Sequence, residues 1–161
     1  MKKLDNRGFT LAEIMVVIAI MGILAGATSA SINQIFSNQT RKFINDCDAM
    51  LTRCRVETLS GAPDGTCVEL RCDLSGKYYV AYYEGGSSDP IEEEQLKRSS
   101  ASCMYRIADG NLVGLGAGES LQISYDRTTG ALKTGCNYTE IAVGNSKITL
   151  VPATGYHKVG G

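Results

Sequence analysis

The hydrophobic pattern divides the chain into three parts with different periods. Residues 9–30 carry one charge, Glu13, and are otherwise mostly apolar or small. After them, apolar residues recur at steps of three, four and seven, which mark one face of an amphipathic helix. That face consists of Phe36, Phe43, Cys47, Met50, Cys54 and Thr58. From Gly65 onward the period changes to two, which is typical of β-strands.

The first two parts predict one long helix, from Thr10 to about Ser60. No proline precedes Pro63, and the sequence Gly61-Ala62-Pro63 is a stop signal for a helix. The apolar part is long enough to cross a membrane, because about 20 helical residues at about 1.5 Å each cover a hydrocarbon core of roughly 30 Å.

Charges before the apolar part predict its orientation. Lys2, Lys3 and Arg7 precede it, against Asp5 alone. By the positive-inside rule the N-terminus stays in the cytoplasm and the rest of the chain is exported. An alternative is a secretory signal peptide cut after Ala27. The interrupting carboxylate and a helical pattern that continues past residue 27 favour a helix that is kept.

Downstream of the helix, alternating segments separated by turn residues predict an antiparallel sheet packed on the exported half of the helix. The predicted strands are Thr66–Cys72, Lys77–Tyr83, Cys103–Ile107, Leu121–Tyr125, Glu140–Val143, Lys147–Val151 and Tyr156–Val159. Residues 89–98 predict a short surface helix instead, with Asp89 as its N-cap and Pro90 as its first residue. An acidic cation-binding loop is the alternative there.

These elements predict an α+β fold. The expected organisation is a basic leader at 1–8, a membrane-spanning helix at 9–30, an amphipathic half of the helix at 31–60, and a β-rich globular domain at 61–161. The chain has 161 residues and a net charge of −1, which gives no general reason to bind nucleic acid.

Six cysteines lie on the side of the chain that is expected to be exported, where disulfides persist. They are Cys47, Cys54, Cys67, Cys72, Cys103 and Cys136. The first two are seven residues apart, about 10.5 Å along a helix, which is too far for them to pair with each other. Each would need a partner in the sheet. Six cysteines allow fifteen pairings in all, the choice among the remaining ones is open, and buried free thiols are the alternative.

Neither catalysis nor cofactor binding finds support in the sequence. The cysteine spacings are not those of a zinc site, and His157 is the sole histidine. The repeat Gly114-x-Gly116-x-Gly118 is not a dinucleotide fingerprint and indicates a flexible turn. We therefore expect no enzyme activity, no metal, no cofactor, no small-molecule substrate and no direct contact with nucleic acid.

The stretch Arg7-Gly8-Phe9-Thr10-Leu11-Ala12-Glu13 resembles the processing site of the type IV pilin and pseudopilin superfamily. Family members have a basic leader that ends at a glycine, a mature chain that begins with phenylalanine, and a glutamate four residues later. The resemblance implies that a prepilin peptidase cuts between Gly8 and Phe9 and methylates the new amine of Phe9. It also implies a pilin-like fold, whose mature chains leave the membrane to form a filament with residues 9–30 in its core.

Other positions in the sequence indicate the type of subunit. Ala30 stands where many major pilins have a proline, which favours a minor pilin or a pseudopilin. Two parts of the sequence resemble the H-type minor pseudopilins of type II secretion. One is Arg55-Val56-Glu57, and the other is Lys147–Leu150 followed by Thr154–Tyr156. The expected partners are then the peptidase, the membrane and other subunits. A subunit of a DNA-uptake pilus is a close alternative, and a secreted β-rich binding domain is an alternative of another class.

Glu13 has two interpretations. Thr10 and Glu13 fit a capping box, in which each side chain bonds the amide of the other residue. The resemblance implies instead that Glu13 acts between subunits during assembly. Gly22 and Gly26 form a G-x-x-x-G pair that allows close approach of a neighbouring helix.

Overall fold

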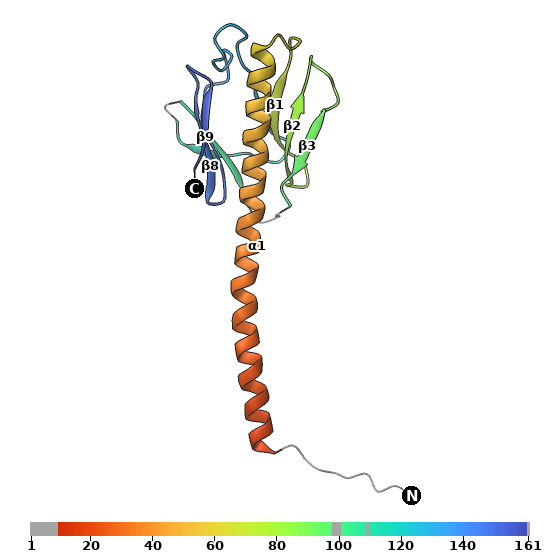
Figure 1. Ribbon diagram of the computed structural model, residues 1–161, viewed down its shortest axis with the longest axis vertical. Helices are drawn as coiled ribbons and strands as arrows, with labels where there is room; N and C mark the ends of the chain where they lie inside the picture. The colour runs from red at the N-terminus through yellow and green to blue at the C-terminus, as the bar shows by residue number, and fades with distance from the viewer. Residues whose placement is uncertain (1–9, 98–100, 109, 161) are drawn as a thin grey trace, which may run out of the picture. The chain divides into compact units, whose positions relative to one another are not determined.

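The computed structural model describes residues 10–97, 101–108 and 110–160, and it does not describe the side chains of residues 27–36. The chain divides into two compact units, Met1–Phe36 and Ser37–Gly161. The predicted leader, with the proposed cleavage site at Gly8 and Phe9, lies outside the described residues. The order of the elements can be followed in Figure 1.

Helix α1 runs from Leu11 to Leu59 and confirms the long helix predicted from the sequence. Its end follows from backbone chemistry. Gly61 adopts a φ of +98°, a left-handed conformation that suits a residue without a side chain. The amide of Ala62 then donates to the carbonyl of Glu57 at 2.8 Å, and this closes the last turn as a Schellman motif.

From residue 11 to residue 26 the described side chains of the helix are apolar or small on every side, except at Glu13. Its large hydrophobic side chains between Leu11 and Leu24 are all exposed, from 49% at Val17 to 77% at Leu11. Within the described part of the chain, no helix is both long and apolar enough to cross a membrane. The predicted membrane-spanning helix at 9–30 includes Phe9 and side chains that lie outside the described residues.

In the second unit the described strands form two antiparallel sheets, not the single sheet that we predicted. Sheet A has the order β3-β2-β1-β6, and sheet B has the order β5-β4-β7-β8-β9. Figure 1 shows β1, β2 and β3 on one side of the second half of α1 and β8 and β9 on the other. Alternation alone cannot separate one sheet from two, because both bury every second residue.

The bounds of the strands agree closely with the sequence pattern at most positions. Sheet A contains β1 (Cys67–Cys72), β2 (Tyr78–Tyr83), β3 (Glu92–Gln95) and β6 (Ser120–Ile123). Sheet B contains β4 (Cys103–Ile107), β5 (Leu112–Gly114), β7 (Tyr138–Val143), β8 (Ser146–Val151) and β9 (Tyr156–Gly160).

One hydrophobic core joins the second half of α1 to the inner faces of both sheets. The predicted helix face is confirmed for its described side chains, since Phe43, Cys47, Met50, Cys54 and Thr58 are all buried. Each sheet contributes alternate residues to the same core, and these include Val68, Leu70, Val80 and Ile123 from sheet A and Ile141, Val143, Ile148 and Leu150 from sheet B.

The short helix predicted at 89–98 is wrong, because residues Glu92–Gln95 form strand β3 at the edge of sheet A. The flanking amides explain the change. Ile91 donates to the Tyr82 carbonyl and Leu96 donates to the Tyr78 carbonyl, both at 2.9 Å, so the segment continues the ladder of β2. These sheet contacts replace the weak helical charge pairs that the sequence had indicated.

Alternation along β3 separates its three glutamates. Glu92 and Glu94 face helix α1, where they lie 3.3 Å from Arg53 and 3.6 Å from Lys42. Glu93 points to the opposite face of the sheet and pairs with Arg71. Each carboxylate of this acidic run therefore meets a different cation. Charged side chains on an edge strand also discourage pairing with a foreign strand.

Candidate functional site

The described chain begins at the residues that carry the assembly hypothesis. The Thr10 amide and hydroxyl both donate to Oε2 of Glu13 at 2.8 Å, and the Glu13 amide donates to the Thr10 hydroxyl at 3.3 Å. This is the capping box that the sequence predicted. Both Thr10 contacts converge on a single carboxylate oxygen, so Oε1 can accept from a second donor.

The apolar segment, defined as residues 11–26 of α1, has an uncovered surface. A side-chain carbon added at Gly22 or Gly26 would meet nothing within 4 Å in the single chain. The two glycines lie four residues apart and share one side of the helix. The packing role predicted for them therefore requires a neighbouring helix, and it stays a prediction.

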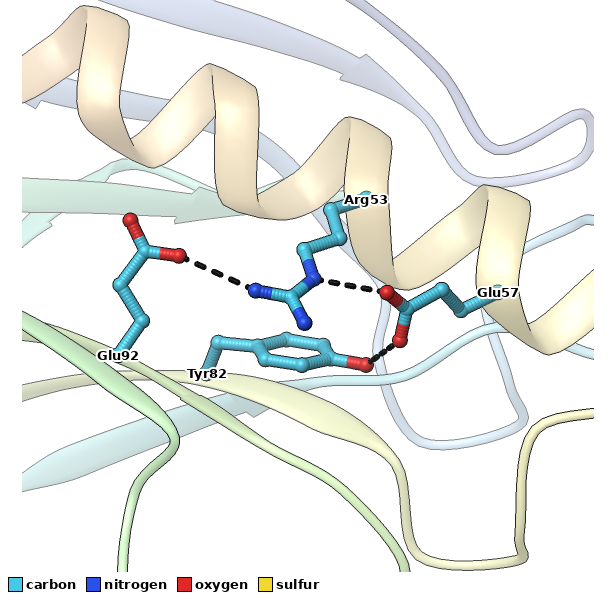
Figure 2. A network of polar contacts seen from close by, with 4 residues as sticks. All are labelled: Arg53, Glu57, Tyr82 and Glu92. Atoms are coloured by element: carbon cyan, nitrogen blue, oxygen red, sulfur yellow. Dashed lines mark hydrogen bonds and ion pairs between the residues drawn. The ribbon is translucent and has the colours of Figure 1, made fainter.

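A second group of polar residues ties the end of α1 to sheet A (Figure 2). Arg53 donates to Glu57 at 2.8 Å and to Glu92 at 3.3 Å, and its guanidinium lies 4.5 Å from the centre of the Tyr82 ring. The Tyr82 hydroxyl donates to the other oxygen of Glu57. We call these residues the Arg53 network.

The chemistry of the Arg53 network is that of a structural tie. The Tyr82 hydroxyl, and then Arg53, lower the pKa of Glu57 below its usual value. Burial, and then Glu57, raise the pKa of Tyr82. The carboxylate therefore stays charged and the phenol stays neutral at physiological pH. Opposite shifts of this kind are the consequence of a fixed hydrogen bond, and they do not prepare either group for proton transfer near neutral pH.

Arg55 ties the same end of the helix to two loops on the side of sheet B. Its Nε donates to the Gly130 carbonyl at 3.1 Å, and its Nη2 donates to the Thr154 carbonyl at 3.0 Å. Arg55 and Glu57 are thus the two side chains of the Arg-x-Glu stretch that the sequence singled out. The structure gives them separate roles, since one contacts loops near sheet B and the other contacts β2.

His157 links the last strand to the helix. Its Nε2 lies 3.0 Å from the Thr52 hydroxyl and 3.5 Å from an Asp48 oxygen, and its side chain is 8% exposed. The sequence marked His157 only as the sole histidine and assigned it no role. No periodicity links a residue in β9 to one in α1, because the two are 105 positions apart.

The six cysteines are free thiols, so the predicted disulfides are not confirmed. Cys47, Cys54, Cys72 and Cys103 are buried, and Cys67 and Cys136 are half-buried. Burial raises the pKa of Cys54 and Cys103 to about 12. A thiol in this setting packs as a small hydrophobic group and seldom ionises, so it reacts slowly.

No metal centre is found among the described residues, which contain no group of three His, Cys, Asp or Glu placed to hold an ion. The alternative of a cation-binding loop at 89–98 finds no support in this arrangement. Its carboxylates are paired with Lys42, Arg53 and Arg71.

Comparison with known proteins gives two matches. The family model of the prokaryotic N-terminal methylation motif matches residues 3–29. The type IV major fimbrial protein FimA of Dichelobacter nodosus is 27% identical over 118 residues, which cover 68% of this chain and 71% of that protein. No solved structure gives a significant match. The two matches confirm the resemblance to the type IV pilin and pseudopilin superfamily.

Proposed function

We propose that this chain is a non-enzymatic subunit of a pilin-like filament that assembles at the cytoplasmic membrane. A prepilin peptidase cuts between Gly8 and Phe9 and methylates Phe9. The mature chain stays in the membrane, with its N-terminus at the cytoplasmic side and residues 61–161 exported. It then joins the filament. The methylation-motif match and the similarity to a fimbrial protein support this proposal.

The observation that carries the proposal is the uncovered apolar segment behind this motif. A helix that is hydrophobic all round must be buried in a membrane or in a large core. Ten large apolar side chains between Leu11 and Leu24 are exposed. Before assembly lipid covers them, and afterwards the same segment of neighbouring subunits does.

We propose that Glu13 pairs with a positive charge that exists only after cleavage. The new amine of Phe9 has a reference pKa of about 7.7–8.0 and is mostly protonated at neutral pH. An unpaired carboxylate inside a bilayer costs about 2.5 kcal/mol or more. Pairing Glu13 of one chain with the amine of another offsets this cost. The pair also fixes the position of one helix along its neighbour, which hydrophobic packing alone does not specify.

The type of filament is a finer question. We place the chain as a minor pseudopilin of type II secretion or a minor type IV pilin, because Ala30 replaces a common proline and residues 55–57 resemble the H-type subunits. In this chain Arg55 and Glu57 hold the end of α1 to the loops near sheet B and to β2. A DNA-uptake pilus is the second candidate.

N-terminal sequencing and mass measurement of the chain, purified from the membranes of cells that contain the peptidase, test the processing step. We expect a first residue of Phe9, heavier by one methyl group. The control is the same chain from cells without the peptidase, which should begin at Met1. A mature chain that begins at Thr28 would show that a signal peptidase cut after Ala27, and it would overturn the proposal.

Glu13→Gln and Thr10→Ala separate the assembly role from the cap. Glu13→Gln removes the charge, and Thr10→Ala removes the cap partner but keeps the charge. We expect Glu13→Gln to be cleaved but poorly recovered with partner subunits in pull-down, Glu13→Asp to be intermediate, and Thr10→Ala to assemble nearly as wild type. Equal losses for Glu13→Gln and Thr10→Ala would mean that the carboxylate only caps the helix.

A further inference from the structure

The outer faces of the two sheets, which point away from α1, carry opposite charges. On sheet A, the residues that alternate with the buried ones are Glu69 and Arg71 of β1 and Glu93 of β3, as the strand register requires. Asp73 and Glu119 flank them, and together these residues line a hollow of about 520 Å³. Four carboxylates and one guanidinium therefore line the acidic face.

The single cation of the acidic face is already engaged. Arg71 pairs with Glu93, and its guanidinium lies 5.2 Å from the centre of the Tyr79 ring. Glu69 forms no ion pair with the described residues of its own chain. The acidic face thus keeps an excess of negative charge, beside a fully protruding hydrophobic side chain, Leu74, which is 90% exposed.

Sheet B presents the opposite charge on its outer face. Arg106 of β4, Lys147 of β8 and Lys158 of β9 share one face of the sheet, opposite to the buried Ile148 and Leu150, as the cross-strand register shows. The acid among them is Glu140, which Arg106 approaches to 3.3 Å and Lys147 to 3.5 Å. This basic face keeps an excess of positive charge on the described strands.

An apolar pair completes the basic face. Val151 and Tyr156 lie directly opposite each other on β8 and β9 and are 41% and 55% exposed. A face that combines cations with exposed apolar side chains suits a partner that combines carboxylates with an exposed leucine. The acidic face has this composition.

We infer that the acidic face of one copy of this chain docks on the basic face of a second copy. This inference rests on the proposed function and deepens it, because it names the contact between subunits. The two faces lie on different sides of the second half of α1 (Figure 1), so they cannot meet within one chain. Contact between two different patches leaves one free patch of each kind at the ends, where a further subunit can add.

Charge complementarity also selects against the alternative dimer. A two-fold pair through either face alone would place like charges against each other, which is unfavourable at close approach. The head-to-tail arrangement brings opposite charges together and fixes the orientation of each new subunit. The contact should weaken with salt, because exposed charges are screened over about 10 Å at about 0.1 M ionic strength.

Zero-length carbodiimide cross-linking of the full chain in mild detergent tests the contact directly. A one-to-one mixture of unlabelled and ¹⁵N-labelled chains distinguishes links between copies from links within one. We expect mixed-isotope peptides that join Lys147 or Lys158 to Glu69 or Glu119, and we expect them to disappear at about 0.5 M salt. Association with no such links would overturn the inference.

Charge reversal supplies the second arm, measured by sedimentation velocity of the full chain in the same detergent. Lys147→Glu with Lys158→Glu should weaken association by about tenfold, and so should Glu69→Lys with Glu119→Lys. Mixing the two reversed chains should restore it, which loss of folding would not do. Lys133→Glu, outside both faces, is the control. If the acidic-face reversal fails to fold, Glu69→Gln with Glu119→Gln should also weaken association.

The outcomes separate this inference from the proposed function. If the chains are cleaved before Phe9 and enter filaments, but neither charge reversal changes their association, only the docking inference is overturned. Chains that bind another subunit through these faces but not each other also overturn it, since the occupant named here is a second copy. Chains that are neither cleaved nor associated overturn both.

Discussion

Replacing Tyr82 by Phe, Glu57 by Ala, and both together measures how firmly α1 is tied to sheet A. The Tyr82 side chain is fully buried, and its hydroxyl donates to Glu57. The Glu57 side chain is 33% exposed, so water can partly replace a lost partner. Ala is a good helix former, so the change at position 57 adds no cost in helix propensity.

The size of the effect follows from these exposures. A hydrogen bond to a charged group contributes about 1.5–3 kcal/mol, and the partial exposure of Glu57 favours the lower end. We expect Tyr82→Phe to destabilise by about 1.5 kcal/mol. Glu57→Ala should cost about 2–3 kcal/mol, because it also leaves a buried hydroxyl without an acceptor. The coupling in the double-mutant cycle should be about 1–1.5 kcal/mol.

The effect should depend on pH with a defined sign. The pKa of Glu57 is lower in the folded chain, so its contribution is present above its unfolded pKa, about 4.3. The contribution is lost as pH falls through the folded pKa. The cost of Tyr82→Phe should therefore be constant near pH 7 and should shrink below about pH 4.

Urea denaturation of the full chain in mild detergent is monitored by the near-ultraviolet circular dichroism of the tyrosines. It gives the free energy of unfolding of the wild type, the two single variants and the double variant. Tyr156→Phe is the matched control, because Tyr156 is 55% exposed and should change stability by less than about 0.5 kcal/mol. A coupling below about 0.3 kcal/mol, or the same cost at pH 3 and pH 7, would refute the reasoning.

Three further changes test other parts of the fold. Arg55→Met should destabilise by about 1–2 kcal/mol and speed hydrogen exchange in the two loops that the guanidinium contacts; unchanged exchange there would contradict this. Gly155→Ala should destabilise by clearly more than Gly76→Ala in the same denaturation assay. Both glycines have positive φ, but an added side-chain carbon at Gly155 collides with the Gly130 carbonyl, while at Gly76 it meets nothing within 4 Å; equal losses would disprove the collision. Iodoacetamide labelling of the native chain, read by mass spectrometry, should modify Cys67 and Cys136 well before the buried thiols Cys47, Cys54, Cys72 and Cys103. A disulfide at any position would contradict the free-thiol state.

The helix and most strands could be predicted because their signals are local. The steps between Phe43, Cys47, Met50 and Cys54 define a buried face whatever covers it, and the structure buries all four. Strand β1 shows the same advantage. Its alternation of Val68, Leu70 and Cys72 with polar residues needs no knowledge of which strands lie beside it.

What the sequence did not reveal depends on contacts between distant residues. The segment at 89–98 has the charges and the N-cap of a helix, and only the free edge of β2 makes it a strand. The Arg53 network joins α1, β2 and β3, so Arg53 and Tyr82 gave no sign of a common site. The division into two sheets is equally non-local, because β1 pairs with β6 across about 50 intervening residues.

The contact between His157 and α1 also bears on how this chain folds, because it joins residues far apart in the sequence. The first helix packs against the last strand, and a loop of roughly 100 residues must close before that contact contributes. Topologies dominated by such distant pairings fold slowly. As the chain emerges from its N-terminus, sheet A and strands β4, β7 and β8 can cover α1 first, but Asp48 and Thr52 meet His157 only when β9 follows. A chain broken off before residue 156 therefore lacks this tie between α1 and sheet B and leaves β8 as an unpaired edge strand, which is the kind of surface that chaperones and proteases recognise in unfinished proteins.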